Sequence, residues 1–200
     1  LLNGRAVLYR LRGEIGRAER DEAELEELGR SRDDAGNLRW QMLARAWAQW
    51  PHDPAVALSE LMASADGLPD PEAAVAREVA RMSLRFDDRE ALAEAVSLHQ
   101  QRRRPGSIAL EAQSQWIDGL VADDGGRTTE GAAEELEQCG YVIRALDAWA
   151  DAALLAARAG RSSVALDQAL DIVRRTGLHP LLGPLPETRW VASKPAAVER

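Results

Sequence analysis

Aspartates occur as adjacent pairs at three places in this 200-residue sequence, at positions 33–34, 87–88 and 123–124. Neighbouring carboxylates can bind a divalent metal ion, but such a site needs several oxygen ligands that converge on one point. These pairs instead fall between predicted helices. There an aspartate accepts hydrogen bonds from free backbone N–H groups and favours the positive end of the helix dipole. We therefore predict that the pairs cap helices and bind no metal ion.

Histidine and cysteine form no catalytic pattern either. His52, His99 and His179 lie in or beside predicted loops, and no two are three or four residues apart, so we expect surface histidines without zinc. The single cysteine, Cys139, falls on the inward side of a predicted helix and is expected to be buried and inert. The glycine-rich stretch 125–128 lacks the lysine of a phosphate-binding loop. The sequence therefore predicts no enzyme and no cofactor.

Tryptophan is the remaining residue type of interest, with six residues against two tyrosines and one phenylalanine. Trp116 and Trp149 fit packing positions between helices. Trp40, Trp47 and Trp50 cluster within one predicted helix. Because one helix cannot bury every side, we expect at least one of these three to be exposed, as tryptophans at interaction hot spots are. The alternative is that all three belong to the core.

Composition indicates the elements that carry these residues. The chain is 46% apolar and 29% charged, which is typical of globular proteins, and its abundant Ala, Leu, Arg and Glu favour helices over strands. We therefore expect an all-α fold. The net charge of −8 disfavours binding to nucleic acid or an anionic membrane. Neither a signal peptide nor an apolar run of ~20 residues is present, so we expect a cytoplasmic location.

Repeated spacings indicate how the helices are organised. Trp116 precedes Trp149 by 33 residues, and Ala132 precedes Ala165 by 33, close to the period of about 34 in tetratricopeptide (TPR) repeats. Small residues allow the two helices of a hairpin to approach closely. Five helix pairs are aligned on alanines at 18, 57, 91, 132 and 165. The predicted pairs span residues 1–31, 35–67, 71–103, 107–139 and 141–177.

Residues 141–177 resemble a TPR unit on Trp149, Ala153, Ala156, Gly160, Ala165 and Ala169, although the terminal proline of that motif is absent. The resemblance implies a right-handed α-solenoid of about five antiparallel helix pairs. More narrowly, the degenerate Ala- and Arg-rich repeats resemble the C-terminal helical regions of large actinobacterial regulators. In those proteins, such repeats follow a signal-transduction ATPase module. Because Leu1 is not Met and already lies in a helical pattern, we expect a part of a larger bacterial protein.

Residues 178–200 differ from the repeats because prolines at 180, 184, 186 and 195 exclude a long helix. Leu181, Leu182, Leu185 and Trp190 are expected to fold back as a cap over the last pair, with a disordered end after Trp190. The alternative is an extended linker.

The leading functional hypothesis is a protein-interaction or scaffolding module that binds a peptide or a neighbouring domain on its concave face. Most of the expected contact residues lie on the first helix of each pair: Asn3, Arg10, Arg39, Trp47, Gln49, Trp50, Asp147 and Arg158. The alternatives are a sensor of small molecules for a transcriptional regulator or signalling ATPase, and a self-association domain that forms a homodimer.

Overall fold

A computed structural model of the chain describes residues 2–32, 35–65, 74–103 and 106–182. These residues form ten helices and no strand, which confirms the predicted all-α class. The helices are α1 (Leu2–Leu11), α2 (Ile15–Arg32), α3 (Ala35–Gln49), α4 (Pro54–Ala65), α5 (Ala74–Phe86), α6 (Arg89–Arg102), α7 (Ile108–Gly119), α8 (Arg127–Gln138), α9 (Val142–Arg158) and α10 (Ala165–Thr176).

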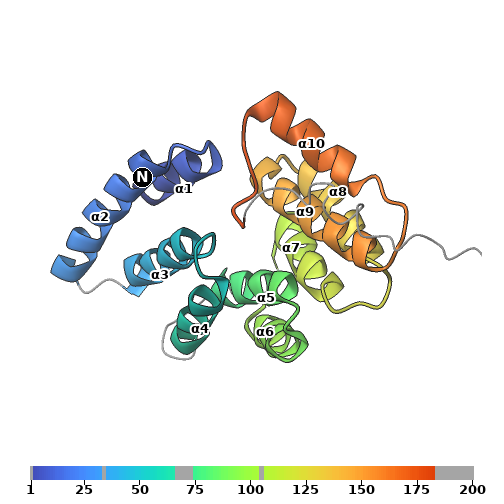
Figure 1. Ribbon diagram of the computed structural model, residues 1–200, viewed down its shortest axis with the longest axis horizontal. Coiled ribbons are helices and arrows are strands. Elements are labelled where there is room, and N and C mark those ends of the chain that lie inside the picture. The colour runs from blue at the N-terminus through green and yellow to red at the C-terminus, as the bar shows by residue number, and fades with distance from the viewer. Residues whose placement is uncertain (1, 33–34, 66–73, 104–105, 183–200) are drawn as a thin grey trace, which may run out of the picture.

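Consecutive helices pack against one another along most of the chain. Figure 1 shows them following an arc, from α1 and α2 through α3 to α6 and on to α9 and α10. The alanines at 18, 57, 91, 132 and 165 are all buried, which confirms that these positions face neighbouring helices. Helices α7 and α8 approach closely at Gly119. A Cβ atom added to Gly119 would lie 2.5 Å from Thr129 Oγ1 and 2.9 Å from the Thr129 backbone nitrogen.

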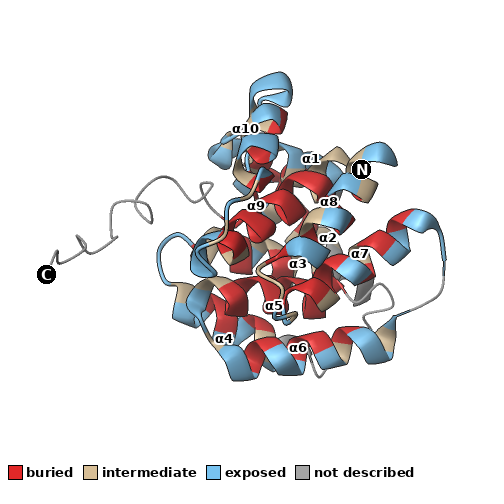
Figure 2. Ribbon diagram, turned by 90° about the vertical axis from the view of Figure 1, so that its right-hand side faces the viewer, coloured by how far each residue is buried: buried red, intermediate tan, exposed pale blue. Residues whose placement is uncertain are grey.

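Two helices, α5 and α9, are buried on every side along most of their length. Every residue from Ala74 to Leu84 in α5 and from Ala145 to Leu154 in α9 is buried, and both helices are mostly red in Figure 2. An amphipathic helix at a surface exposes its polar face. Here the polar residues of α5 and α9 are buried together with the apolar ones.

Aspartates cap three of the helices, and two of these caps come from the predicted pairs at 87–88 and 123–124. The Asp53 carboxylate accepts the Val56 N–H of α4, and Asp88 accepts the Ala91 N–H of α6. Asp124 accepts the backbone N–H groups that open α8, at distances from 2.8 to 3.0 Å. Asp87 differs from the prediction: it has a left-handed backbone (φ 62°) and pairs with Arg158. The aspartates at 33–34 lie outside the described residues.

Two predictions about single side chains are wrong. Cys139 is exposed rather than buried, because α8 ends at Gln138 and the cysteine forms its C-cap. His99 is buried at 4% exposure, because it lies within α6 rather than in a loop. His52 and His179 are exposed, as expected.

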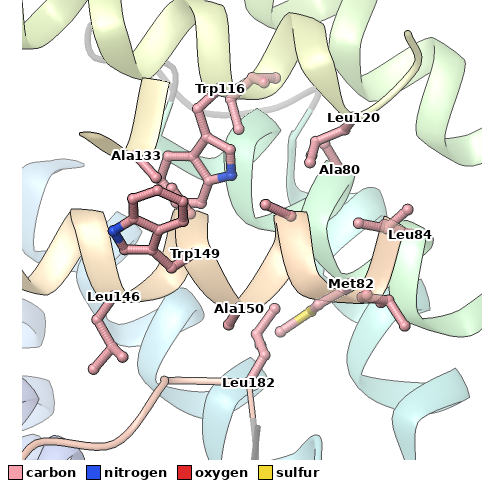
Figure 3. Close-up of a cluster of buried hydrophobic side chains, with 14 of the residues drawn as sticks. Ala80, Met82, Leu84, Trp116, Leu120, Ala133, Leu146, Trp149, Ala150 and Leu182 are labelled. Carbon is pink, nitrogen blue, oxygen red and sulfur yellow. The ribbon is translucent and has the colours of Figure 1, made fainter. Parts of the chain in front are cut away.

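The chain turns back toward the first helices after α10. Gly177 ends that helix with a left-handed backbone (φ 69°), and the His179 N–H then donates to the Leu11 carbonyl of α1 at 2.7 Å. Leu178 and Leu182 are buried in the common core, and Leu182 points toward Ala150 and Met82 (Figure 3). Leu182 is therefore placed between α9 and α5, and Leu185 and Trp190 of the predicted cap lie outside the described residues.

Candidate functional site

Buried charges gather where α3, α5, α7 and α9 meet, and we call this region the inner face. Arg81 lies at its centre. Its guanidinium contacts Glu78 at 2.8 Å, Asp147 at 2.8 Å and Asp151 at 3.0 Å, and all four side chains are fully buried. Burying ions is costly unless each finds partners of opposite charge. The three carboxylates around one guanidinium meet that requirement.

Two tryptophans donate further hydrogen bonds to these carboxylates. The Trp116 indole N–H donates to Asp151 at 3.1 Å, and the Trp47 indole N–H donates to Glu78 at 3.4 Å. Trp116 also lies under the Arg81 guanidinium, whose carbon is 5.0 Å from the ring centre. Such a stack is stabilising because the face of the indole ring is electronegative.

Three further arginines surround the cluster. Arg85 contacts Asp151 at 2.5 Å, Arg144 contacts Glu78 at 3.5 Å, and Arg77 contacts Glu78 at 3.4 Å. With Arg81 these give four positive charges against three negative ones. The cluster therefore carries one excess positive charge.

Burial and ion pairing shift the pKa values of these groups in different directions. Burial alone would raise the pKa of Glu78, but the positive charges of Arg81, Arg77 and Arg144 outweigh it and lower that pKa to about 2. Burial lowers the pKa of Arg77 to about 10, and the nearby Arg144 adds to the effect. Burial raises the pKa of Asp147 even though Arg81 opposes the rise. Glu78 is therefore ionised at neutral pH.

An apolar cleft opens beside this network, and we call it the Trp40 cleft. It consists of two adjoining hollows that share Val7, Trp40 and Trp47. The first has a volume of about 220 Å³ and lies between α1, α2 and α3. The second, of about 420 Å³, is also lined by residues 140–144 at the start of α9 and by Leu181. The Trp40 and Trp47 rings are 6.4 Å apart between centres, so they form one aromatic wall.

The rim of the first hollow is polar. Arg10 makes a bidentate ion pair with Glu22 at 2.6 and 2.7 Å, and Arg45 pairs with Glu26 at 2.5 Å. Glu19 also lines this rim and is exposed. After both ion pairs are counted, Glu19 leaves the rim with a negative charge.

The structure brings some of the predicted contact residues together. Arg10 and Trp47 line the Trp40 cleft. Asp147 lies next to it but is fully buried by its pairing with Arg81, so the prediction that it faces an open groove is wrong. Because residues 178–182 and the neighbouring helices cover the inner face, this carboxylate is closed off from solvent.

The other predicted contact residues lie elsewhere. Trp50 is buried in the core and Arg39 is nearly buried, so neither presents its side chain to a partner, while Gln49 is half-buried. Arg158 is exposed at the end of α9 and pairs with Asp87 at 3.3 Å. The side chain of Asn3 lies outside the described residues.

The sequence analysis missed the centre of the network. Arg77, Arg81 and Arg85 are four residues apart, as are Asp147 and Asp151, and such spacings place each set on one face of its helix. These two stripes of opposite charge were the available signal.

Comparison with known proteins gives no relative: no family model, no curated protein and no solved structure matches this chain. None of the helices in the described ranges is long and apolar enough to cross a membrane. Among the same residues, no group of three or more His, Cys, Asp or Glu side chains could hold a metal ion.

Proposed function

We propose that this chain is a TPR-like interaction module that binds an apolar protein segment on its inner face, at the Trp40 cleft. The observation that carries the proposal is the aromatic wall of Trp40 and Trp47, which lines two adjoining hollows. Trp40 is only half-buried, so part of its ring remains available. Tryptophans in such partly open positions are enriched among residues that dominate binding energy.

The chemistry of the cleft indicates what would bind there. Its walls are mostly apolar, since Ala6, Val7, Ala44 and Ala48 line it beside the tryptophans. A leucine, isoleucine or methionine side chain fits such a surface. The exposed Glu19 on the rim favours a lysine or arginine next to that apolar anchor.

The architecture supports the wider proposal of a scaffold within a larger bacterial regulatory protein. Helical pairs that stack along an arc give a continuous concave surface, and this is how repeat proteins hold extended partners. The buried alanines at 18, 57, 91, 132 and 165 support the close helix packing that a TPR-like stack requires. The partner is either a separate protein or another domain of the same polypeptide, and both would bind to the same surface. We propose that this binding takes place in the cytoplasm.

Selection from a random displayed-peptide library, using the wild-type chain as bait, tests the proposal. We expect recovered peptides to share an apolar residue beside a basic one. Trp40→Ala should weaken their binding at least about tenfold, because loss of a buried aromatic anchor commonly costs ~2 kcal/mol. Phe86→Ala is the matched control, since Phe86 is an exposed aromatic residue on α5 and does not line the cleft. Recovery of no common sequence, or equal binding by Trp40→Ala, would contradict the proposal.

The small volume of the first hollow favours a second candidate function, the sensing of a small apolar molecule. A volume of about 220 Å³ with aromatic and alanine walls suits a ligand smaller than a peptide. A thermal-shift screen of apolar metabolites distinguishes the two functions, because a ligand that binds only the folded chain raises its Tm. A Tm rise that is lost in Trp40→Ala supports the sensor.

A further inference from the structure

Residues 178–182 lie on the inner face in the manner of a bound peptide. They follow α10 without forming helix or strand structure, and they bury Leu178, Pro180 and Leu182 while His179 stays exposed. Burial of alternate side chains is how a peptide is selected on a protein surface, with main-chain hydrogen bonds providing the general attachment.

The main chain of this segment is held at two points on different helices. The His179 N–H donates to the Leu11 carbonyl of α1 at 2.7 Å. The Leu181 N–H donates to the Asp147 carboxylate of α9 at 3.2 Å. The same carboxylate oxygen contacts Arg81 at 2.8 Å. The buried charge network therefore presents an acceptor, fixed in position, to the backbone of whatever lies on the inner face.

The segment also borders the proposed binding site. Leu181 lines the second hollow of the Trp40 cleft, together with Val7 and Trp40. Leu182, next along the chain, points toward Ala150 and Met82 (Figure 3). If these two leucines left, the hollow would extend toward the centre of the inner face.

We infer that residues 178–182 are a built-in occupant of the inner face, and that the partner is a protein segment of the same chemistry. Such a partner carries leucines on both sides of a proline and competes with residues 178–182 for the same contacts. The inference rests on the proposed function. It adds the sequence character of the partner and an autoinhibitory contact, because the chain must release its own segment before the partner binds.

A labelled synthetic peptide with the sequence of residues 177–182 provides the test in the full chain. We expect weak binding to the wild type. Binding should be at least about tenfold tighter to the double variant Leu178→Asp with Leu182→Asp, because the apparent Kd scales inversely with the fraction of chains whose site is open. Leu110→Asp is the matched control, because Leu110 is exposed on α7. This variant should bind the peptide as the wild type does. Circular dichroism shows whether each variant is folded.

Hydrogen exchange in the wild type gives a second test that needs no variant. Unlabelled peptide is added at millimolar concentration, which is comparable to the effective concentration of a tethered segment. By displacing residues 178–182 it should speed hydrogen exchange of the His179 and Leu181 amides. A scrambled peptide should not. If the folded double variant binds the peptide no better than the wild type, or if exchange at these amides is unchanged by the peptide, the inference is overturned.

The outcomes also separate this inference from the proposed function. If library peptides bind through Trp40 but the 177–182 peptide has no effect, the proposed interaction module is supported and the inference about residues 178–182 is contradicted. If neither the library peptides nor the 177–182 peptide binds, both the proposed function and this inference are contradicted.

Discussion

Arg81 and Trp116 donate to the same oxygen atom. The guanidinium Nε and the indole Nε1 lie 3.0 and 3.1 Å from Asp151 Oδ2, although Arg81 and Asp151 are 70 residues apart in the sequence. The guanidinium also stacks over the indole ring. A single carboxylate of α9 thus ties α5 and α7 to each other, and the inner face is held by polar contacts as well as by apolar packing.

Replacing Arg81 should be among the most damaging substitutions in the chain. Arg81→Met leaves three buried carboxylates without their central cation, and breaking a buried pair in this way typically costs about 3–5 kcal/mol. Urea unfolding measures the loss. Arg89→Met, at an exposed position of α6, should change the free energy of unfolding by less than ~0.5 kcal/mol. Similar costs for the two variants would show that the network contributes little to stability.

Glu78 should make the stability of the chain depend on pH in the acid range. Its folded pKa of about 2 lies below the ordinary value of 4.5, so its contribution is complete above pH 4.5 and is lost as the pH falls toward 2. Asp147 has a raised pKa and acts in the opposite sense. The contribution of Glu78 is the difference in free energy of unfolding between the wild type and Glu78→Gln. We expect this difference to shrink by on the order of 3 kcal/mol between pH 5 and pH 2.

Chemical denaturation at a series of pH values measures this difference. Glu94→Gln, at an exposed position of α6, should run parallel to the wild type at every pH. A Glu78→Gln curve that also runs parallel to the wild type would contradict the assignment of the acid-sensitive term to Glu78.

Two glycines should respond in opposite directions to the same substitution. A Cβ at Gly119 would lie 2.9 Å from the Thr129 backbone nitrogen, so Gly119→Ala must push α7 and α8 apart and should cost about 1–3 kcal/mol. Gly131 lies within α8 with nothing within 4 Å of the added atom, so Gly131→Ala should stabilise the chain by ~0.5–1 kcal/mol. Thermal unfolding checks both, and a lowered Tm for Gly131→Ala would show that the packing around α8 is not as described.

The capping role of Asp124 can be tested against its neighbour. Asp124→Ala removes the acceptor for the Gly126, Arg127 and Thr128 N–H groups and should cost about 1 kcal/mol. Asp123→Ala changes an exposed aspartate beside it and should cost less than ~0.5 kcal/mol. Equal losses in urea unfolding would indicate that net charge, rather than capping, sets the effect.

The sequence predicted the features of this fold that depend on neighbouring residues. Asp88 caps the helix that follows it, because a cap bonds only to N–H groups two or three residues away. The five buried alanines were predictable because helical spacing places small residues on one face.

The buried network was not predictable in the same way, because it depends on which helices meet. Asp147 has the pattern of a residue that faces an open groove, but the packing of α5 against α9 and the return of residues 178–182 bury it. Likewise, Trp50 belongs to the core because several other helices surround α3. The candidate site was therefore predicted in part, with Arg10 and Trp47 at the cleft and with Arg81 and Glu78 missed.

The hydrogen bond between His179 and Leu11 joins the first helix to the segment that follows the last one. A linear array of repeats has two free ends, and its outermost units can melt while the middle stays folded. A ring has no outermost unit. Because this contact and the core leucines beside it close the arc, disturbance at α1 reaches residues 178–182 directly, without passing through the nine helices from α2 to α10. The two ends of the described chain should therefore melt together.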